Sequence, residues 1–160
     1  MHQETELFDQ LDSSILLEVL SEEKIKGKKR RLKHQKTKQY IETLQYAKIS
    51  IPAFGEVAKT IVRDAENDFD KAYVFIRLVR LLWDTNITFN APQRAACRML
   101  CAVMDFDYTI EPQDAMRIAE AKETGAKRFV TLDEKLVDKK ALQERFRIKI
   151  EFPWGEKPVT

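Results

Sequence analysis

The chain has 160 residues, a formal net charge of only +2, and 44% apolar and 34% charged residues. This size is typical of one domain with a sizeable core, and the composition excludes the disordered and fibrous classes of protein. No stretch is apolar enough to span a bilayer and no signal-like region opens the chain, so we expect a cytoplasmic protein without membrane contact. We expect a single domain over residues 1–152, with a basic insert at 24–38 and an exposed tail at 153–160.

The first expected elements are a strand over residues 6–11, weakened by Asp9, and a helix over 15–20, joined by a turn at Asp12 and Ser13. A basic segment follows, with nine Lys or Arg and no acid between Lys24 and Lys38. Without this segment the net charge would be about −7. We weigh a solvated loop or helix face equally with a surface that contacts phosphate groups. Phosphate contacts would not select a sequence and would weaken with salt. The residues that would make them are Lys28, Lys29, Arg30, Arg31 and Lys33.

The remaining elements alternate between strands and helices. Strands are expected over residues 48–52, 86–90, 127–131 and 148–152, and helices over 36–47, 53–64, 68–82, 92–104, 113–124 and 134–145. Pro92 and Pro112 open two of these helices, and Gly125 ends one of them. This alternation predicts an α/β fold of three layers, with a mostly parallel central sheet covered by helices on both faces.

Two helices carry side chains that we expect to be buried. In the helix over residues 68–82, an apolar stripe at helical spacing is expected to form core; it consists of Tyr73, Ile76, Val79 and either Leu82 or Trp83. Cys97 and Cys101 lie four residues apart, which places them on one helix face. We expect buried thiols there, because two cysteines alone lack the further soft ligands of a metal site.

Four carboxylates lie where turns meet regular elements. Asp12 follows the first strand, Glu56 falls on the first turns of the helix after the second, and Asp133 follows the fourth; Asp114 opens the helix before that strand. Singly, Asp12 and Asp133 are more often helix caps, and Asp114 is more often a partner of the helix dipole. Because the carboxyl ends of parallel strands share one edge of a sheet, we expect the acids to gather there. Four clustered carboxylates repel one another unless a cation lies among them, and hard oxygen ligands suit Mg²⁺ or Mn²⁺.

In their order and setting, these residues resemble the PIN domain, a family of metal-dependent nucleases that includes VapC-type toxins and RNA-processing proteins. The resemblance rests on Asp12-Ser13-Ser14, Glu56-Val57, Asp114-Ala115 and Thr131-Leu132-Asp133, and it covers residues 7–152. The less apolar first strand and the long basic segment depart from the family pattern.

The resemblance implies a PIN-like fold and hydrolysis of RNA phosphodiester bonds. Asp12, Glu56, Asp114 and Asp133 would be both the catalytic residues and the ligands of Mg²⁺ or Mn²⁺. Ser13 and Thr131 would orient a carboxylate or a water molecule, or serve only as turn hydroxyls. The implied partners are RNA, an antitoxin protein and a second copy of the chain in a homodimer.

Two other functions stay open at this point. One is a non-catalytic RNA-binding or interaction module on the same fold, with the basic segment as its contact surface. The other is a phosphatase-like hydrolase, although an aspartyl intermediate would call for an Asp-x-Asp pair where the chain has Asp12-Ser13-Ser14.

Overall fold

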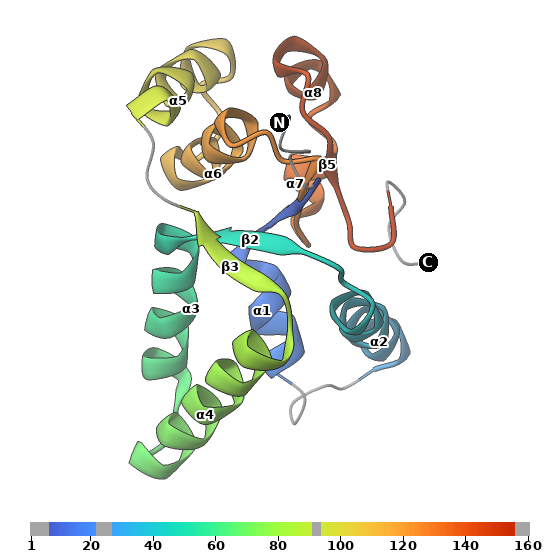
Figure 1. Ribbon diagram of the computed structural model, residues 1–160, viewed down its shortest axis with the longest axis vertical. Helices are drawn as coiled ribbons and strands as arrows, with labels where there is room; N and C mark the ends of the chain where they lie inside the picture. The colour runs from blue at the N-terminus through green and yellow to red at the C-terminus, as the bar shows by residue number, and fades with distance from the viewer. Residues whose placement is uncertain (1–6, 22–26, 91–93, 156–160) are drawn as a thin grey trace, which may run out of the picture.

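In the computed structural model, which describes residues 7–21, 27–90 and 94–155, five parallel strands form one sheet in the order β3-β2-β1-β4-β5 (Figure 1). The strands are β1 (Asp9–Leu11), β2 (Ala47–Ser50), β3 (Ile87–Asn90), β4 (Arg128–Val130) and β5 (Ile150–Glu151). β1 lies in the centre, between β2 and β4. The strand order therefore reverses at β1, and in such sheets functional groups gather at the carboxyl ends of the strands beside this point.

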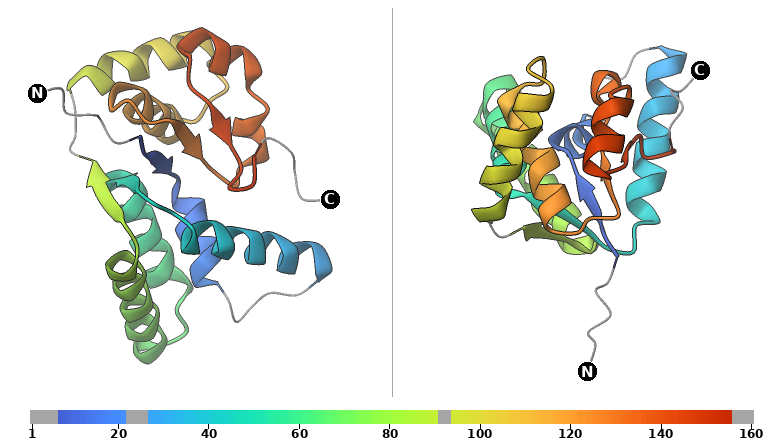
Figure 2. Two further views of the ribbon diagram at one scale, coloured as in Figure 1. Left: turned by 45° about the vertical axis from the view of Figure 1, so that its right-hand side comes forward. Right: turned by 90° about the horizontal axis from the view of Figure 1, so that it is seen from above.

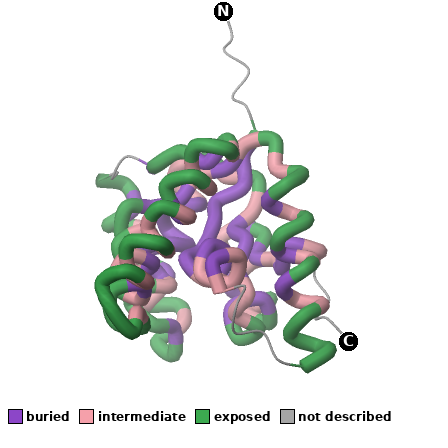
Figure 3. The backbone as a smooth tube through the Cα atoms, turned by 90° about the horizontal axis from the view of Figure 1, so that it is seen from below, coloured by how far each residue is buried: buried purple, intermediate pink, exposed green. Residues whose placement is uncertain are grey.

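Helices cover both faces of the sheet, which confirms the predicted three-layer α/β fold. The helices are α1 (Ser13–Leu20), α2 (Lys28–Glu42), α3 (Ile51–Asp64), α4 (Asp68–Asp84), α5 (Arg94–Phe106), α6 (Pro112–Glu123), α7 (Glu134–Val137) and α8 (Lys140–Phe146). One core joins α1–α4 to Leu11 and Ile49 of the sheet, and a second joins α5–α8 to Phe129 and Ile150. In Figure 1 the first group of helices lies below the strands and α5, α6 and α8 lie above them. The buried residues concentrate on the strands between the two layers (Figure 3).

Asp9 does not interrupt the first strand. It is the first residue of β1, which is three residues long, and residue 6 of the predicted strand lies outside the described residues. Its buried carboxylate accepts hydrogen bonds from Arg128 of the neighbouring strand (Nη2 to Oδ2, 2.9 Å) and from the Tyr40 hydroxyl (2.7 Å). A paired and hydrogen-bonded charge is tolerated at a buried position, which is why an acid can stand here.

The basic segment is helical from residue 28 onward, eight residues before the predicted helix start. Residues 24–26 lie outside the described part of the chain. Lys, Arg and Gln are good helix formers, and α2 buries only a narrow side with His34, Thr37 and Ile41. α2 and the α3–α4 pair diverge from α1 on different sides (Figure 2, left).

The predicted core stripe of α4 is wrong, because the helix turns its other side to the core. Leu78 is buried, with Val74 and Leu81 beside it in the first core. The residues of the predicted stripe other than Leu82 are exposed: Tyr73, Ile76, Val79 and Trp83. α4 carries apolar residues around most of its circumference, so periodicity alone does not choose the face that packs against α1 and α3.

The two cysteines are also exposed rather than buried. α5 packs chiefly against α6 and buries Ala96 and Val103, while Cys97 and Cys101 point away from this contact. α5 is an outer helix with a single buried face, so Ala95 and Ala102 are exposed as well.

The C-terminal part departs from the prediction in two places. The helix expected over 134–145 is divided into α7 and α8, because Lys139 leaves helical backbone angles (φ −76°, ψ 63°). At the start of the predicted exposed tail, Pro153 is buried and Trp154 stacks on Phe152 with ring centroids 5.5 Å apart. Residues 156–160 of that tail lie outside the described residues, among which no helix is long and apolar enough to cross a membrane.

Candidate active site

Asp12 lies at the carboxyl end of the central strand and caps α1. Its Oδ1 accepts the backbone N–H of Ser13 (2.9 Å), and its Oδ2 accepts the hydroxyls of Ser14 (2.6 Å) and Thr131 (2.8 Å). The side chain is 5% exposed. The helix-start role that a single Asp predicts is therefore real, but the same carboxylate also faces residues far away in the chain.

Glu56 and Asp114 reach the same place from opposite layers. Glu56 lies on α3, where its Oε2 accepts the Ser13 hydroxyl at 2.7 Å. Asp114 lies in the first turn of α6, and its side chain is 21% exposed. Asp12, Glu56 and Asp114 thus meet at one edge of the sheet, as predicted from their order in the chain.

Arg117 joins these three carboxylates, and sequence reasoning missed it. Its Nη1 donates to Asp12 Oδ1 (2.9 Å) and Asp114 Oδ1 (3.2 Å), and its Nη2 donates to Glu56 Oε2. The Arg117 side chain is only 7% exposed. The available signal was a cation three residues after Asp114, because that spacing puts both on one side of a helix.

Asp133 lies at the same edge but outside the Arg117 contacts. It caps α7, with its Oδ1 accepting the Lys135 N–H at 2.8 Å, and its own N–H donates to the Thr131 hydroxyl at 3.0 Å. Thr131 therefore links Asp133 to Asp12, while Ser13 links Asp12 to Glu56 through hydrogen bonds to both carboxylates. Ser14, which sequence reasoning did not assign, also binds the Leu132 N–H at 3.1 Å.

The acids affect one another electrostatically. Burial raises the pKa of Asp114 to about 6; the charges of Asp12, Asp133 and Glu56 add to the rise, and that of Arg117 opposes it. Asp114 is thus sensitive to all three other predicted site residues, which is the behaviour expected of a carboxylate in an acidic cluster.

The donor types suit a hard divalent cation, since four carboxylates and several hydroxyls lie at one edge. Within the described part of the chain, however, no group of three or more His, Cys, Asp or Glu residues is arranged to hold a metal ion. The guanidinium of Arg117 contacts the carboxylates of Asp12, Glu56 and Asp114. The residues fit Mg²⁺ or Mn²⁺ by chemistry, but an ion and the guanidinium cannot share this position.

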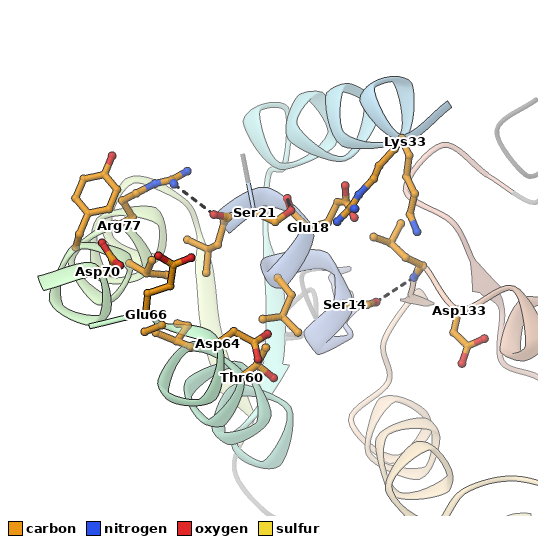
Figure 4. A pocket seen from close by; sticks show the side chains of 18 residues that line it. Ser14, Glu18, Ser21, Lys33, Thr60, Asp64, Glu66, Asp70, Arg77 and Asp133 are labelled. Carbon is orange, nitrogen blue, oxygen red and sulfur yellow. Dashed lines mark hydrogen bonds between the residues drawn. The ribbon is translucent and has the colours of Figure 1, made fainter. Parts of the chain in front are cut away.

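A groove of about 730 Å³ opens beside the acids and runs between α1, α2, α3 and α4 (Figure 4). Ser14 and Asp133 lie at one end, and Arg77 and Glu66 at the other. Of the five predicted nucleic-acid-binding residues, Arg30 and Lys33 line the groove. The other three, Lys28, Lys29 and Arg31, are exposed on the first turns of α2 and are not part of its lining.

No protein-family model and no curated protein matches the chain, whereas several solved structures do. FitAcB from Neisseria gonorrhoeae matches with 15% identity and a TM-score of 0.64, over 92% of this chain and 99% of that chain. VapBC2 from Rickettsia felis, bound to a DNA fragment from their promoter, matches with 10% identity and a TM-score of 0.59, over 91% and 98%. VapBC-1 from nontypeable Haemophilus influenzae matches with 15% identity and a TM-score of 0.57, over 92% and 99%. At these identities the likeness concerns the fold, and at that level it confirms the predicted resemblance: the chain has a PIN-like fold.

Proposed function

We propose that this protein is an endoribonuclease that hydrolyses RNA phosphodiester bonds with Mg²⁺ or Mn²⁺. One observation carries the proposal: three carboxylates from distant parts of the chain converge on one buried arginine at the switch point of a PIN-like sheet. Buried ion clusters are weak contributors to stability, because desolvation of the charges offsets much of their attraction. A cluster of this kind at the functional edge of the sheet is better explained by chemistry than by folding.

Asp12, Glu56, Asp114 and Asp133 would hold the metal ion. When bound, the ion would lower the pKa of a water molecule and stabilise negative charge on the phosphate. Ser14 and Thr131 hold Asp12 Oδ2 in place, and Ser13 holds Glu56. These hydroxyls orient the carboxylates before RNA arrives, as the partners of metal ligands commonly do.

The groove beside Asp133 would receive the RNA strand. Arg30 and Lys33 line it, and their charges would contact phosphate groups of the bound strand. The acidic side chains of Asp64 and Glu66 line the far part of the same groove and disfavour a long polyanion there. The RNA path would therefore follow the α2 side of the groove.

We also propose an antitoxin partner, because two of the similar structures are VapBC proteins and this chain covers nearly the whole length of the matched chains. The homodimer and the cytoplasmic location stay predictions.

The test is cleavage of a labelled, mixed-sequence single-stranded RNA with Mn²⁺, with Mg²⁺ and with EDTA. The inactive variant should be Asp114→Asn, and Glu144→Gln, an exposed charge removal on α8, is the matched control. We expect metal-dependent cleavage by the parent and by the control, and none by Asp114→Asn. Salt-sensitive RNA binding without cleavage under any condition would instead support the non-catalytic binding module.

A further inference from the structure

The guanidinium of Arg117 uses only part of its hydrogen-bonding capacity. Its Nη1 and Nη2 contact the three carboxylates, but its Nε is buried and has no hydrogen-bond partner among the described residues. A buried donor without a partner carries a free-energy penalty, and the penalty is larger for a charged group. The contacts of Arg117 in the acidic cluster therefore leave one of its hydrogen-bond donors unused.

Glu120, one helical turn further along α6, has a buried acceptor oxygen without a donor in the described part of the chain. Its side chain is buried beside Ser50, which lowers its pKa, and its Oε2 has no hydrogen-bond partner within the described residues. Residues three apart on a helix are neighbours on its surface, so Arg117 can reach Glu120 by changing its rotamer. A guanidinium and a carboxylate form strong paired hydrogen bonds when they meet.

Arg117 is also the cation that acts on Glu120 electrostatically. The pKa of Glu120 is raised by burial, and Ser50 and the charge of Arg117 partly offset this rise. Ser50 is a neutral hydroxyl at the end of β2, and its oxygen also accepts the Ala53 N–H at 3.2 Å. Of the two groups that lower the pKa of Glu120, Arg117 is therefore the charged one.

We infer that Arg117 is a built-in counterion that the divalent cation displaces from the carboxylates, and that Glu120 receives the displaced guanidinium. This inference rests on the proposed function and adds to it a positioning residue that controls metal occupancy. In the metal-free protein, Arg117 offsets the repulsion among Asp12, Glu56 and Asp114. When an ion binds, the guanidinium moves toward Glu120, and its Nε and the free carboxylate oxygen pair.

The exchange lowers the apparent affinity for metal, because each ion that binds must break the Arg117 contacts first. Glu120 partly compensates by stabilising the displaced arginine. Metal affinity should therefore depend on both residues, and their effects should be coupled rather than additive.

The test measures Mn²⁺ binding to the full chain by calorimetry in four proteins: the parent, Arg117→Gln, Glu120→Gln and the double variant. We expect Arg117→Gln to bind Mn²⁺ at least about tenfold more tightly, since a like charge at contact distance is gone. Glu120→Gln should bind Mn²⁺ several-fold more weakly than the parent, and should change nothing when Arg117 is already Gln. Arg117→Lys, which keeps the charge, should bind no more tightly than the parent.

The outcomes separate this inference from the proposed function. Equal or weaker Mn²⁺ binding by Arg117→Gln, with metal-dependent cleavage by the parent, overturns the inference and leaves the nuclease. No Mn²⁺ binding and no cleavage by either protein overturns both. If Arg117→Gln does not fold without metal, Glu120→Gln decides alone, and Mn²⁺ binding as tight as in the parent refutes the exchange.

Discussion

Replacement of Asp114 by Asn should stabilise the metal-free protein at neutral pH, although it removes a predicted metal ligand. The pKa of Asp114 is raised from 3.8 to about 6, chiefly by burial and then by the neighbouring carboxylates. A rise of this size disfavours the ionised form by at most about 3 kcal/mol. The side chain is 21% exposed, so solvent screens part of the effect, and the Asn oxygen can still accept from Arg117. We expect Asp114→Asn to gain about 1–2 kcal/mol at pH 7.5 in EDTA.

The stability gained by Asp114→Asn should depend on pH. Because the folded pKa of Asp114 lies above the unfolded value, the folded protein binds the extra proton between about pH 4 and pH 6. Wild-type stability therefore falls as pH rises through this window, and the fall is absent in Asp114→Asn. The advantage of the variant should be full at pH 7.5 and close to zero at pH 4.

Urea unfolding followed by circular dichroism at both pH values measures the difference directly. Glu144→Gln is the control, because it removes a charge from an exposed position on α8 and should change stability little at either pH. A loss of stability in Asp114→Asn at pH 7.5, or a gain of equal size at both pH values, would refute the reasoning about repulsion in the acidic cluster.

Three further changes test other parts of the structure. Asp12→Asn should abolish cleavage. Unlike Asp114→Asn, it should also lower the stability of the protein by about 2–4 kcal/mol in a thermal melt. The reason is that every observed partner of this buried carboxylate is a hydrogen-bond donor. Replacing Arg30 and Lys33 together by Gln should weaken RNA binding and lower its salt slope by about 2 in a titration at several salt concentrations, whereas Lys28→Gln, outside the groove, should have a smaller effect. Leu78→Ala should cost about 2–5 kcal/mol in urea unfolding, since this side of α4 forms the core. A near-neutral Leu78→Ala would contradict the observed orientation of the helix.

The alternation of strands and helices was enough to predict the three-layer fold, because a strand buried on both faces and a helix with one apolar side can only be covered in a few ways. The same order was enough to place Asp12, Glu56 and Asp133 at one edge of the sheet, since each comes after a parallel strand and parallel strands end together. These inferences depend on the order of elements along the chain and not on how side chains pack.

Only the tertiary structure decided which face of a helix is buried and which charged side chains pair. α4 has apolar residues on more than one side, and only its contacts with α1 and α3 choose Leu78 over Trp83 as core. The sequence alone predicts that Asp9 weakens its strand, whereas the fold supplies Arg128 and Tyr40 as its partners. Arg117 lies 105 positions from Asp12 in the chain, and its contact with that carboxylate exists because α6 and β1 meet at one edge of the sheet. Local sequence determined on which helix, strand or turn each charged residue lies, but only the fold decided which opposite charge it contacts.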